Sequence, residues 1–420
     1  MKLAVVGAGW AGLACAVAAV RGGTRVTLFE AARTAGGRAR RVDDLHGLAL
    51  DNGQHILIGA YRETLGLMRE VGVDIDAGLL RLPLSLRFAD GGGLQVPAGL
   101  PPPLDLLAGI VGAHGWGWRD KAGLIRAALG WRRRRFDCDA HLSVAALCRD
   151  LSPRVLQELI EPLCVSALNT PAAEASAQVF LRVLSDALFS ERGGADLLLP
   201  RVDLGALLPD PALRWLAQRG ADVRIGTRAQ SIAASAAGWT VDGERFDAVV
   251  LACAPWDAAR LVREAALPQS RDWLRQNEAL RHESIATVYA RNAGPPLHAP
   301  MLALRSGDGA PAQFVFDRSL LGGPAGLLAF VVSASDTTRE ALQQGVMAQA
   351  REQLGLHALE PLRTVVEKRA TFACTPGLER PAMQVAPGLR ACGDYIDGPY
   401  PATLEGAVRS GLAAARAPSP

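Results

Sequence analysis

The chain has 420 residues, of which 49% are hydrophobic and 5% aromatic, so it can bury a sizeable core and is expected to form two domains. Its 45 basic and 42 acidic side chains leave a net charge of +3, which is too small to indicate nucleic-acid binding. The seven cysteines form no CxxC pair, so we expect neither a metal site nor a disulfide framework. No apolar segment is long enough to cross a bilayer, and a strand begins at Lys2 where a signal peptide would lie. We therefore expect a cytoplasmic protein.

The chain opens with a short apolar run, Lys2–Val6, which is typical of a buried parallel strand and leads into the spaced glycines Gly7, Gly9 and Gly12. In a βαβ unit the first glycine permits the tight turn, the second lets the backbone approach a pyrophosphate, and the third allows close packing of helix on strand. The N-terminus of the following helix then faces the phosphates. Because the chain holds 44 glycines, this spacing is a weak motif by itself, and the neighbouring elements decide whether it indicates a dinucleotide site.

A second apolar run, Arg25–Phe29, supplies that context. It ends in Glu30, close to the interval at which a dinucleotide site places a carboxylate on ribose hydroxyls. The alternative is an ordinary βαβ unit with a glycine-rich turn and no ligand. Strand, helix and acid together favour the dinucleotide site.

A second glycine pair follows the acid, in Ala35-Gly36-Gly37-Arg38, and the Arg38 guanidinium can reach a pyrophosphate as a fork of donors. Plain NAD dehydrogenases do not usually continue in this way. The sequence resembles the flavin-dependent amine oxidase and phytoene desaturase superfamily, in which this segment follows the acid and the cofactor is FAD. The resemblance implies an α/β fold, with a Rossmann-like FAD-binding domain and an interleaved α+β substrate domain, and it assigns Gly37 and Arg38 to the cofactor.

Residues 48–61 contain a turn signal, Asp-Asn-Gly, followed by Gln54, His55 and an apolar stretch that carries Tyr61. One interpretation is a hairpin and a helix, with His55 as a core residue. In the superfamily, however, such a segment passes beside the flavin, and the string DNGQHILIGAY resembles the squalene-associated branch. That resemblance places Gln54, His55 and Tyr61 at the cofactor or the substrate.

The resemblance also implies that segments of the two domains alternate along the chain. The FAD-binding domain is expected at residues 1–78, 199–262 and 365–420, and the substrate domain at 79–198 and 263–364. Within the latter, Arg281–Phe330 alternates apolar and polar residues and predicts an antiparallel sheet that forms the floor of a substrate cavity.

Residues Leu104–Phe136 combine an apolar, tryptophan-bearing stretch with a basic segment that ends in four consecutive arginines. In helical projection Leu124 and Leu129 share an apolar face, with Arg126 on the other side. Such a segment could rest on anionic headgroups at the inner face of the cell membrane while a lipid substrate enters the protein. Lys121 falls on the apolar face, so a solvated basic helix packed on the substrate domain is an equal alternative.

Two further strands are expected to return to the cofactor. Asp222–Ile232 alternates as a strand should, and the resemblance implies that the Ala229 backbone amide meets the adenine. Phe246–Pro255 reads as a buried strand, and Thr337–Leu354 as a helix.

The last cofactor segment is expected near the C-terminus. Leu389–Asp394 reads as a strand whose closing residues, Gly393 and Asp394, resemble the superfamily's ribityl and pyrophosphate contact. A helix from Thr403 and Leu404 onward would point its positive end at the flavin and stabilise negative charge on the reduced ring.

The resemblance implies noncovalent FAD, because no cysteine lies between Tyr395 and Leu404 on the immediate approach to this closing helix. Only Lys368 is available as the lysine found near the flavin of many amine oxidases, so an amine substrate is disfavoured. We expect reductive removal of the hydroxyl group of a lipophilic isoprenoid, hydroxysqualene, by an enzyme that receives its electrons from a separate donor. His55 is the candidate acid, with Tyr61 or Tyr400 shaping the pocket. A carotenoid-type desaturase and a non-catalytic carrier of prenylated partners are the alternatives.

Overall fold

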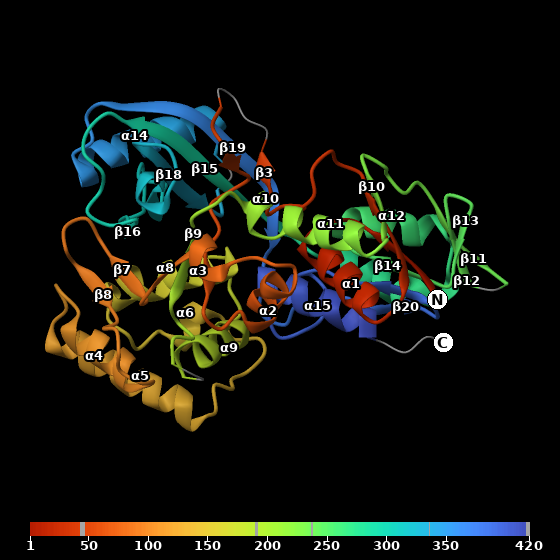
Figure 1. Cartoon of the computed structure of the whole chain (residues 1–420). Coiled ribbons are helices and arrows are strands. Elements are labelled where there is room, and N and C mark those ends of the chain that lie inside the picture. Colours follow the sequence, from red (N-terminus) through yellow and green to blue (C-terminus); the bar gives the residue numbers. More distant parts are fainter. Residues whose placement is uncertain (43–46, 190–191, 237, 336, 417–420) are drawn as a thin grey trace.

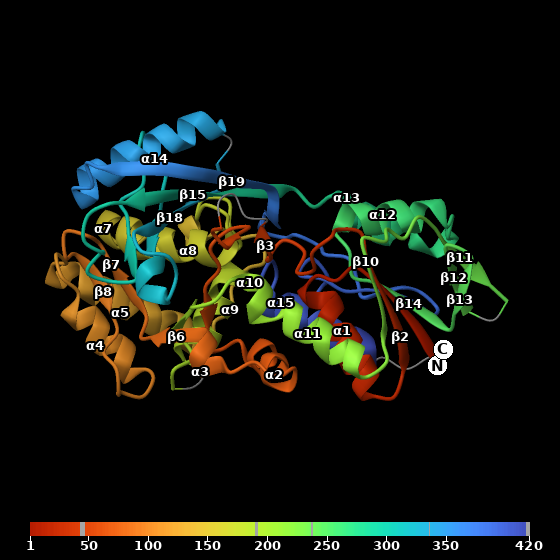
Figure 2. The ribbon, with the colours of Figure 1, turned by 45° about the horizontal axis from the view of Figure 1, so that its top comes forward.

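The computed structural model describes residues 1–42, 47–189, 192–236, 238–335 and 337–416. The molecule is elongated and has two lobes, with both ends of the chain in one lobe and helices α4 and α5 at the far end of the other (Figures 1 and 2). Each lobe is built around one of two large sheets.

The lobe with the chain ends contains a six-stranded sheet whose first five strands are parallel and whose last is antiparallel. Its order is β10 (Asp222–Ile225), β2 (Arg25–Glu30), β1 (Lys2–Val6), β14 (Ala248–Leu251), β21 (Leu389–Ala391) and β20 (Gln384–Ala386). Leu3 to Val6 and all four residues of β14 are buried, as continuous apolar runs in a parallel sheet covered on both faces must be. The dinucleotide-type unit predicted at the N-terminus is therefore present as β1, α1 and β2.

Helices cover both faces of this sheet. On one face α1 (Trp10–Arg21) lies against α11 (Pro209–Gln218) and α15 (Leu404–Arg416). A Cβ on Gly411 would lie 2.1 Å from the Ala11 carbonyl oxygen, so this glycine is what lets α15 approach α1. The other face carries α12 (Pro255–Glu264) and a small meander of β11 (Ile232–Ser235), β12 (Gly238–Val241) and β13 (Glu244–Phe246).

The second lobe contains a five-stranded antiparallel sheet, which confirms the sheet predicted within Arg281–Phe330. Its order is β16 (Met301–Ala303), β17 (Phe314–Asp317), β18 (Leu327–Ser333), β15 (His282–Asn292) and β19 (Leu359–Phe372). Helix α14 (Arg339–Leu354) packs one apolar side on this sheet, with Leu342 and Val346 buried against Val288.

The remaining elements connect and cover these sheets. The helices are α2 (Arg62–Glu70), α3 (Ile75–Gly78), α4 (Leu104–Gly112), α5 (Trp118–Arg133), α6 (Val144–Leu147), α7 (Pro153–Val155), a π-helix (Leu156–Ile160), α8 (Glu161–Leu168), α9 (Ala177–Leu188), α10 (Leu204–Leu207) and α13 (Arg271–Glu278), with short 3₁₀ turns at Pro268–Ser270 and Arg318–Leu321. The short strands are β3 (Arg41–Val42), β4 (Leu50–Asp51), β5 (Leu57–Ile58), β6 (Leu79–Leu82), β7 (Ser85–Arg87), β8 (Gly93–Gln95) and β9 (Leu197–Pro200).

Two predicted strands were wrong in extent. Asp222–Ile232 is divided, because β10 ends at Ile225 and Ile232 begins β11 of the separate meander. Phe246–Pro255 is divided likewise, with Pro255 already opening α12. Alternation along the chain does not reveal where a chain leaves one sheet for another. The predicted domain limits at 198 and 364 fall inside β9 and β19, and the five-part division stays a prediction.

A buried carboxyl group lies where the two lobes meet. The Asp51 Oδ1 atom accepts from the Leu204 amide at 2.9 Å, and the Tyr289 hydroxyl donates to the Asp51 carbonyl at 3.0 Å. Burial raises the pKa of the Asp51 carboxyl from 3.8 to about 7, although the hydrogen bond from Leu204 opposes the shift. The folded protein therefore holds this proton over a pH range in which the unfolded chain releases it.

Asp51→Asn is expected to stabilise the protein above pH 7. Because the folded-state pKa is raised, stability from this site is full below pH 3.8 and is lost as the pH rises to about 7. The amide imitates the neutral acid, so the gain above pH 7 is on the order of 4 kcal/mol and disappears toward pH 4. Urea unfolding at pH 5 and pH 8 measures it, with Asp150→Asn as the exposed control. An equal effect at both pH values would contradict the raised pKa.

Candidate cofactor and substrate site

A cavity of about 620 Å³ is lined by residues from both large sheets and from α8. Most of the residues predicted for the cofactor line it, although they come from both ends of the chain. They are Gly7, Gly9, Glu30, Gly37, Arg38, Gln54, Ala229, Gly393, Asp394, Thr403 and Leu404, together with His55 and Tyr61. Gly12 and Tyr400 are the two predicted residues outside the lining.

The three N-terminal glycines have different physical roles. Gly7 has a φ of +114°, and a Cβ there would lie 2.6 Å from the Ala252 carbonyl oxygen. A Cβ on Gly12 would lie 1.9 Å from the Gly7 carbonyl oxygen, so both positions need glycine for the fold alone. Gly9 has an ordinary φ of −70°, and the nearest atom to its Cβ would be Gly37 Cα at 3.8 Å. The space that a Gly9 side chain would occupy opens into the cavity, so a ligand could approach the protein backbone there.

Glu30 ends β2 and lies at the same end of the cavity. Its Oε2 accepts from the Ala8 amide at 2.7 Å, and its Oε1 from the Ala32 amide at 2.8 Å. Ala229, which is buried in the segment between β10 and β11, lines this end too, and its carbonyl accepts from Arg260. The structure thus brings the carboxylate and Ala229 to the glycine turn.

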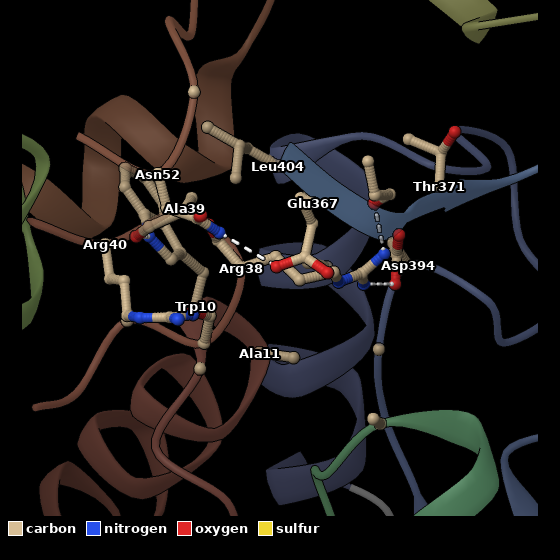
Figure 3. A pocket seen from close by; sticks show the side chains of 18 of the residues that line it. Trp10, Ala11, Arg38, Ala39, Arg40, Asn52, Glu367, Thr371, Asp394 and Leu404 are labelled. Atoms are coloured by element: carbon tan, nitrogen blue, oxygen red, sulfur yellow. Dashed lines mark hydrogen bonds and ion pairs between the residues drawn. The ribbon is translucent and has the colours of Figure 1, made fainter. Parts of the chain in front are cut away.

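Arg38 and Asp394, which are separated by most of the chain, form an ion pair inside the cavity. The Arg38 Nη1 atom also donates to the Ala370 carbonyl at 2.7 Å, so the guanidinium is held between the C-terminal segment and β19 (Figure 3). Gly37, with a φ of +63°, makes the turn that directs Arg38 there. The two predicted pyrophosphate contacts therefore share one location.

Two polar atoms in the lining are buried without a hydrogen-bond partner among the described residues. They are Gln54 Oε1 and the Tyr395 hydroxyl oxygen. Buried polar atoms are nearly always paired, so these two, with the open space at Gly9, fit a bound polar ligand such as a dinucleotide.

His55 lies beside Gln54, and its Nδ1–H donates to the Gly53 carbonyl at 3.2 Å. Burial lowers the pKa of His55, and the positive charge of Arg38 adds to this, although the bond to Gly53 opposes it. A neutral imidazole whose Nδ1 carries the proton presents an acceptor at Nε2.

Helix α15 begins at the cavity. Thr403 Oγ1 accepts from the Gly406 amide at 2.9 Å and so caps the first turn. Glu405, which is fully buried, accepts from the Thr64 amide at 3.0 Å and thereby fixes the start of α2 against α15. Tyr61 precedes α2 and lines the cavity, and burial raises the pKa of its hydroxyl.

Tyr400, by contrast, points away from the lining. Its hydroxyl donates to Asp186 Oδ2 on α9 at 2.7 Å, and Arg409 lies over its ring. Nothing in the local sequence indicated this partner, because Asp186 lies more than two hundred residues earlier in the chain.

The rest of the lining is largely apolar. Strands β15, β17, β18 and β19 and the last turn of α8 contribute Ile285, Phe314, Phe316, Val331, Val365, Val165 and Leu168. The sheet that was predicted as the floor of a substrate cavity thus lines the same cavity as the polar residues predicted for the cofactor. Such a surface suits an apolar molecule.

Glu367 is a lining residue that the sequence did not indicate. It lies on β19 opposite Ile285, and between this pair and the Glu283–Thr371 pair β19 has two more residues than β15. This β-bulge bends the strand beside the cavity. The Glu367 Oε2 atom accepts from Asn52 Nδ2 at 3.0 Å, and Figure 3 shows the carboxylate beside the Arg38 side chain.

Lys368 is exposed and does not line the cavity. The lining residues include no lysine. Across the described part of the chain, all seven cysteines are free, no cluster of three His, Cys, Asp or Glu side chains could hold a metal, and no helix is long and apolar enough to cross a membrane.

Comparison with known proteins gives a family. The model for flavin containing amine oxidoreductases matches residues 10–417. The chain is similar to hydroxysqualene dehydroxylase of Rhodopseudomonas palustris, with 29% identity over 98% of this chain and 96% of the relative. A zeta-carotene desaturase of Synechocystis is 40% identical, but over 17% of this chain and 15% of its own length.

Among solved structures, an oxidoreductase from Methanosarcina mazei has the same fold, with a TM-score of 0.73 and 17% identity, covering 98% of this chain and 99% of the other. The predicted α/β fold is confirmed. The chain belongs to the flavin containing amine oxidoreductase family, and its cofactor is FAD.

Proposed function

We propose that this flavin-dependent oxidoreductase removes the hydroxyl group of hydroxysqualene and produces squalene. The observation that carries the proposal is the apolar wall of β15, β17, β18 and β19 in the same cavity as the dinucleotide residues. The similarity to a hydroxysqualene dehydroxylase over nearly the whole chain supports it. The similarity to a carotenoid desaturase, which is the first alternative, covers 17% of the chain.

The residues proposed to hold FAD follow the cavity from end to end. Ala229 would meet the adenine, Glu30 the ribose, Gly7 and Gly9 the pyrophosphate, and Thr403 and Leu404 the flavin, at the start of α15. Arg38 and Asp394 would contact the pyrophosphate and ribityl chain, with Gly37, Gly393 and Gln54 beside them. Gly12 would act indirectly, by letting α1 pack on the turn.

The reaction needs an acid, because an allylic hydroxyl leaves as water once it is protonated. The C–O bond breaks with its electron pair on oxygen, and reduced FAD supplies the two electrons and the hydrogen that replace the hydroxyl. The protein must deliver the proton in a dry, apolar site.

We propose Glu367 as this acid. Four carboxyl groups line the cavity, and two of them are in ion pairs, Asp394 with Arg38 and Asp257 with Arg228. Glu30 lies at the glycine turn, where both its carboxylate oxygens already accept from backbone amides. Glu367 makes no ion pair within 4 Å of a described basic group, and its charge interacts with that of Arg38 only at longer range. The Asn52 amide and the Arg369 backbone amide donate to its carboxylate.

His55, the acid expected from the sequence, is less suitable. Its lowered pKa leaves the ring neutral at pH 7, and the ring proton on Nδ1 is donated to Gly53. We propose instead that His55 and Tyr61 shape the flavin end of the pocket. Tyr400 would act on the pocket only through its neighbours Ala402 and Thr403, which line it.

Enzyme reduced with dithionite under argon, where dithionite stands in for the electron donor, is expected to convert hydroxysqualene to squalene in a single turnover. Return of the oxidised flavin spectrum should track squalene formation. Double bonds introduced into phytoene or squalene by oxidised enzyme, with no loss of hydroxysqualene under reducing conditions, would replace the proposal with the desaturase. Binding of an isoprenoid without any turnover would instead support a non-catalytic carrier protein.

A further inference from the structure

Helices α4 and α5 expose an unusual share of the large hydrophobic side chains. Ten such side chains are exposed in the described part of the molecule, and six of them lie between residues 100 and 129. They are Leu100, Leu104, Leu107, Val111, Trp118 and Leu129, and Trp118 is the most exposed of all, at 75%. We call the surface formed by these six residues and the arginines of α5 the α4–α5 face. It lies at the end of the molecule away from both chain ends (Figures 1 and 2).

Helix geometry places the three exposed side chains of α4 on one side of that helix. Leu104, Leu107 and Val111 follow the spacing of a single helix face, while Gly109 and Ile110 of the same helix are buried. Monomeric proteins seldom expose many large apolar side chains together without a partner, and here six of the ten lie within thirty residues of the chain.

In α5 the arrangement differs from the sequence prediction. Leu124 and Trp131 face the core, whereas Trp118 and Leu129 face solvent. The prediction that Leu129 shares the apolar face of Leu124 was therefore wrong, because the helix packs on the lobe through Leu124, with Ile125 and Ala128 beside it against the core.

The charges of the arginines in this segment are not balanced by nearby acidic groups, although Arg119 lies over the Trp118 ring and Arg134 Nε donates to the Gly130 carbonyl. Residues 100–136 hold seven basic and two acidic side chains, so this segment is more positive than the whole chain at +3. Arg119, Arg126 and Arg133 repeat every seven residues and are exposed. Among the described residues, none of the six arginines from 119 to 135 makes an ion pair within 4 Å. Lys121, by contrast, is occupied, because its Nζ donates to the Val111 carbonyl at 2.6 Å and closes the end of α4.

We propose that the α4–α5 face rests on an anionic lipid bilayer, with the apolar side chains among the acyl chains and the arginines at the phosphates. Leucine, valine and tryptophan side chains suit the apolar acyl chains of a bilayer, and arginines without an ion pair suit the phosphates of its headgroups. A second copy of the chain is a poorer occupant, because two strongly positive surfaces would repel each other.

The face is joined firmly to the cavity wall. The Trp116 indole between α4 and α5 donates to Glu158 Oε2 at 2.8 Å, and Arg305 donates to Glu158 Oε1 at 2.9 Å. Glu158 is on the π-helix that runs directly into α8, whose last turn lines the cavity. This inference rests on the proposed function for its purpose, since an isoprenoid dissolves in the bilayer that the face would contact.

Cosedimentation with vesicles tests the proposal without turnover. The protein is expected to bind vesicles of phosphatidylglycerol and phosphatidylcholine at low salt and to be released by high salt, because salt screens exposed charges. Each arginine near an anionic surface contributes about 1 kcal/mol, so the double variant Arg126→Gln/Arg133→Gln should lower the partition coefficient roughly 30-fold. Trp118→Ser should weaken binding at any salt concentration.

Matched variants outside the face, Arg351→Gln on α14 and the 40% exposed Leu320→Ser, should bind as the unchanged protein does. Equal recovery in the supernatant with and without anionic vesicles would overturn the proposal. So would a dimer in sedimentation velocity that Trp118→Ser dissociates, since the occupant would then be a second copy. Vesicle binding by a protein that leaves hydroxysqualene unchanged would refute the proposed function alone.

Discussion

Replacing Gly9 with leucine is expected to abolish FAD binding while the protein stays folded. Gly9 has an ordinary φ of −70°, and the first atom that its Cβ would meet is 3.8 Å away, so the protein itself does not require glycine there. A larger side chain would instead fill the space beside the glycine turn into which a pyrophosphate must fit. The flavin absorbance of the purified protein should disappear, with far-UV circular dichroism unchanged.

Two other glycines provide the controls. Gly66→Leu places the same side chain on an exposed turn of α2 with nothing within 4 Å, and should retain the flavin. Gly12→Ala should lower the unfolding temperature, because its Cβ would lie 1.9 Å from the Gly7 carbonyl oxygen. The flavin of the unchanged protein should be released by acid precipitation, as noncovalent binding requires. Normal FAD binding by Gly9→Leu would refute the assignment of this turn to the pyrophosphate.

Glu367→Gln is expected to lower the single-turnover rate roughly 100- to 10,000-fold, the usual contribution of a general acid. Glutamine keeps the size of the side chain and an oxygen that accepts from Asn52, so the cavity and the flavin spectrum should be unchanged. The rate of squalene formation by dithionite-reduced enzyme measures the loss. Substrate binding, followed by the perturbation of the flavin spectrum, should be retained.

His55→Gln separates the two candidate acids. If Glu367 donates the proton, His55→Gln should cost much less activity than Glu367→Gln, because the neutral imidazole has no proton directed into the site. A purely structural role of Glu367 would lower flavin affinity and unfolding temperature together with the rate. A nearly normal rate for Glu367→Gln, with a large loss for His55→Gln, would return the role to His55.

The part of the site proposed for the nucleotide was predictable because its determinants are local. A glycine turn between a strand and a helix, and an acid at the end of the next strand, are set by short spacings in the chain. The structure has Gly7, Gly9 and Glu30 together at the cavity, and the C-terminal Asp394 joins Arg38 there. Motif order was enough to indicate the family and its cofactor.

The substrate end was less predictable because its determinants are contacts between distant segments. Glu367 lines the cavity next to a bulge in the pairing of β19 with β15, and the register between two strands cannot be predicted from either strand alone. Tyr400 lies outside the cavity lining, where its hydroxyl donates a hydrogen bond to Asp186 on α9. The faces of α5 likewise depend on which side the lobe covers.

The sequence by itself thus determined the βαβ unit and the antiparallel sheet, since each follows from local periodicity or from a short motif whose atoms are close in the chain. Its resemblance to the family indicated the cofactor and the segments proposed to hold it. Only the tertiary structure decided that Gly9 is the one glycine of the three that the fold does not need, and that Glu367 shares the cavity with Asn52. Those two facts depend on which backbone or side chain stands opposite a residue in space. Sequence spacing carries no measure of that distance.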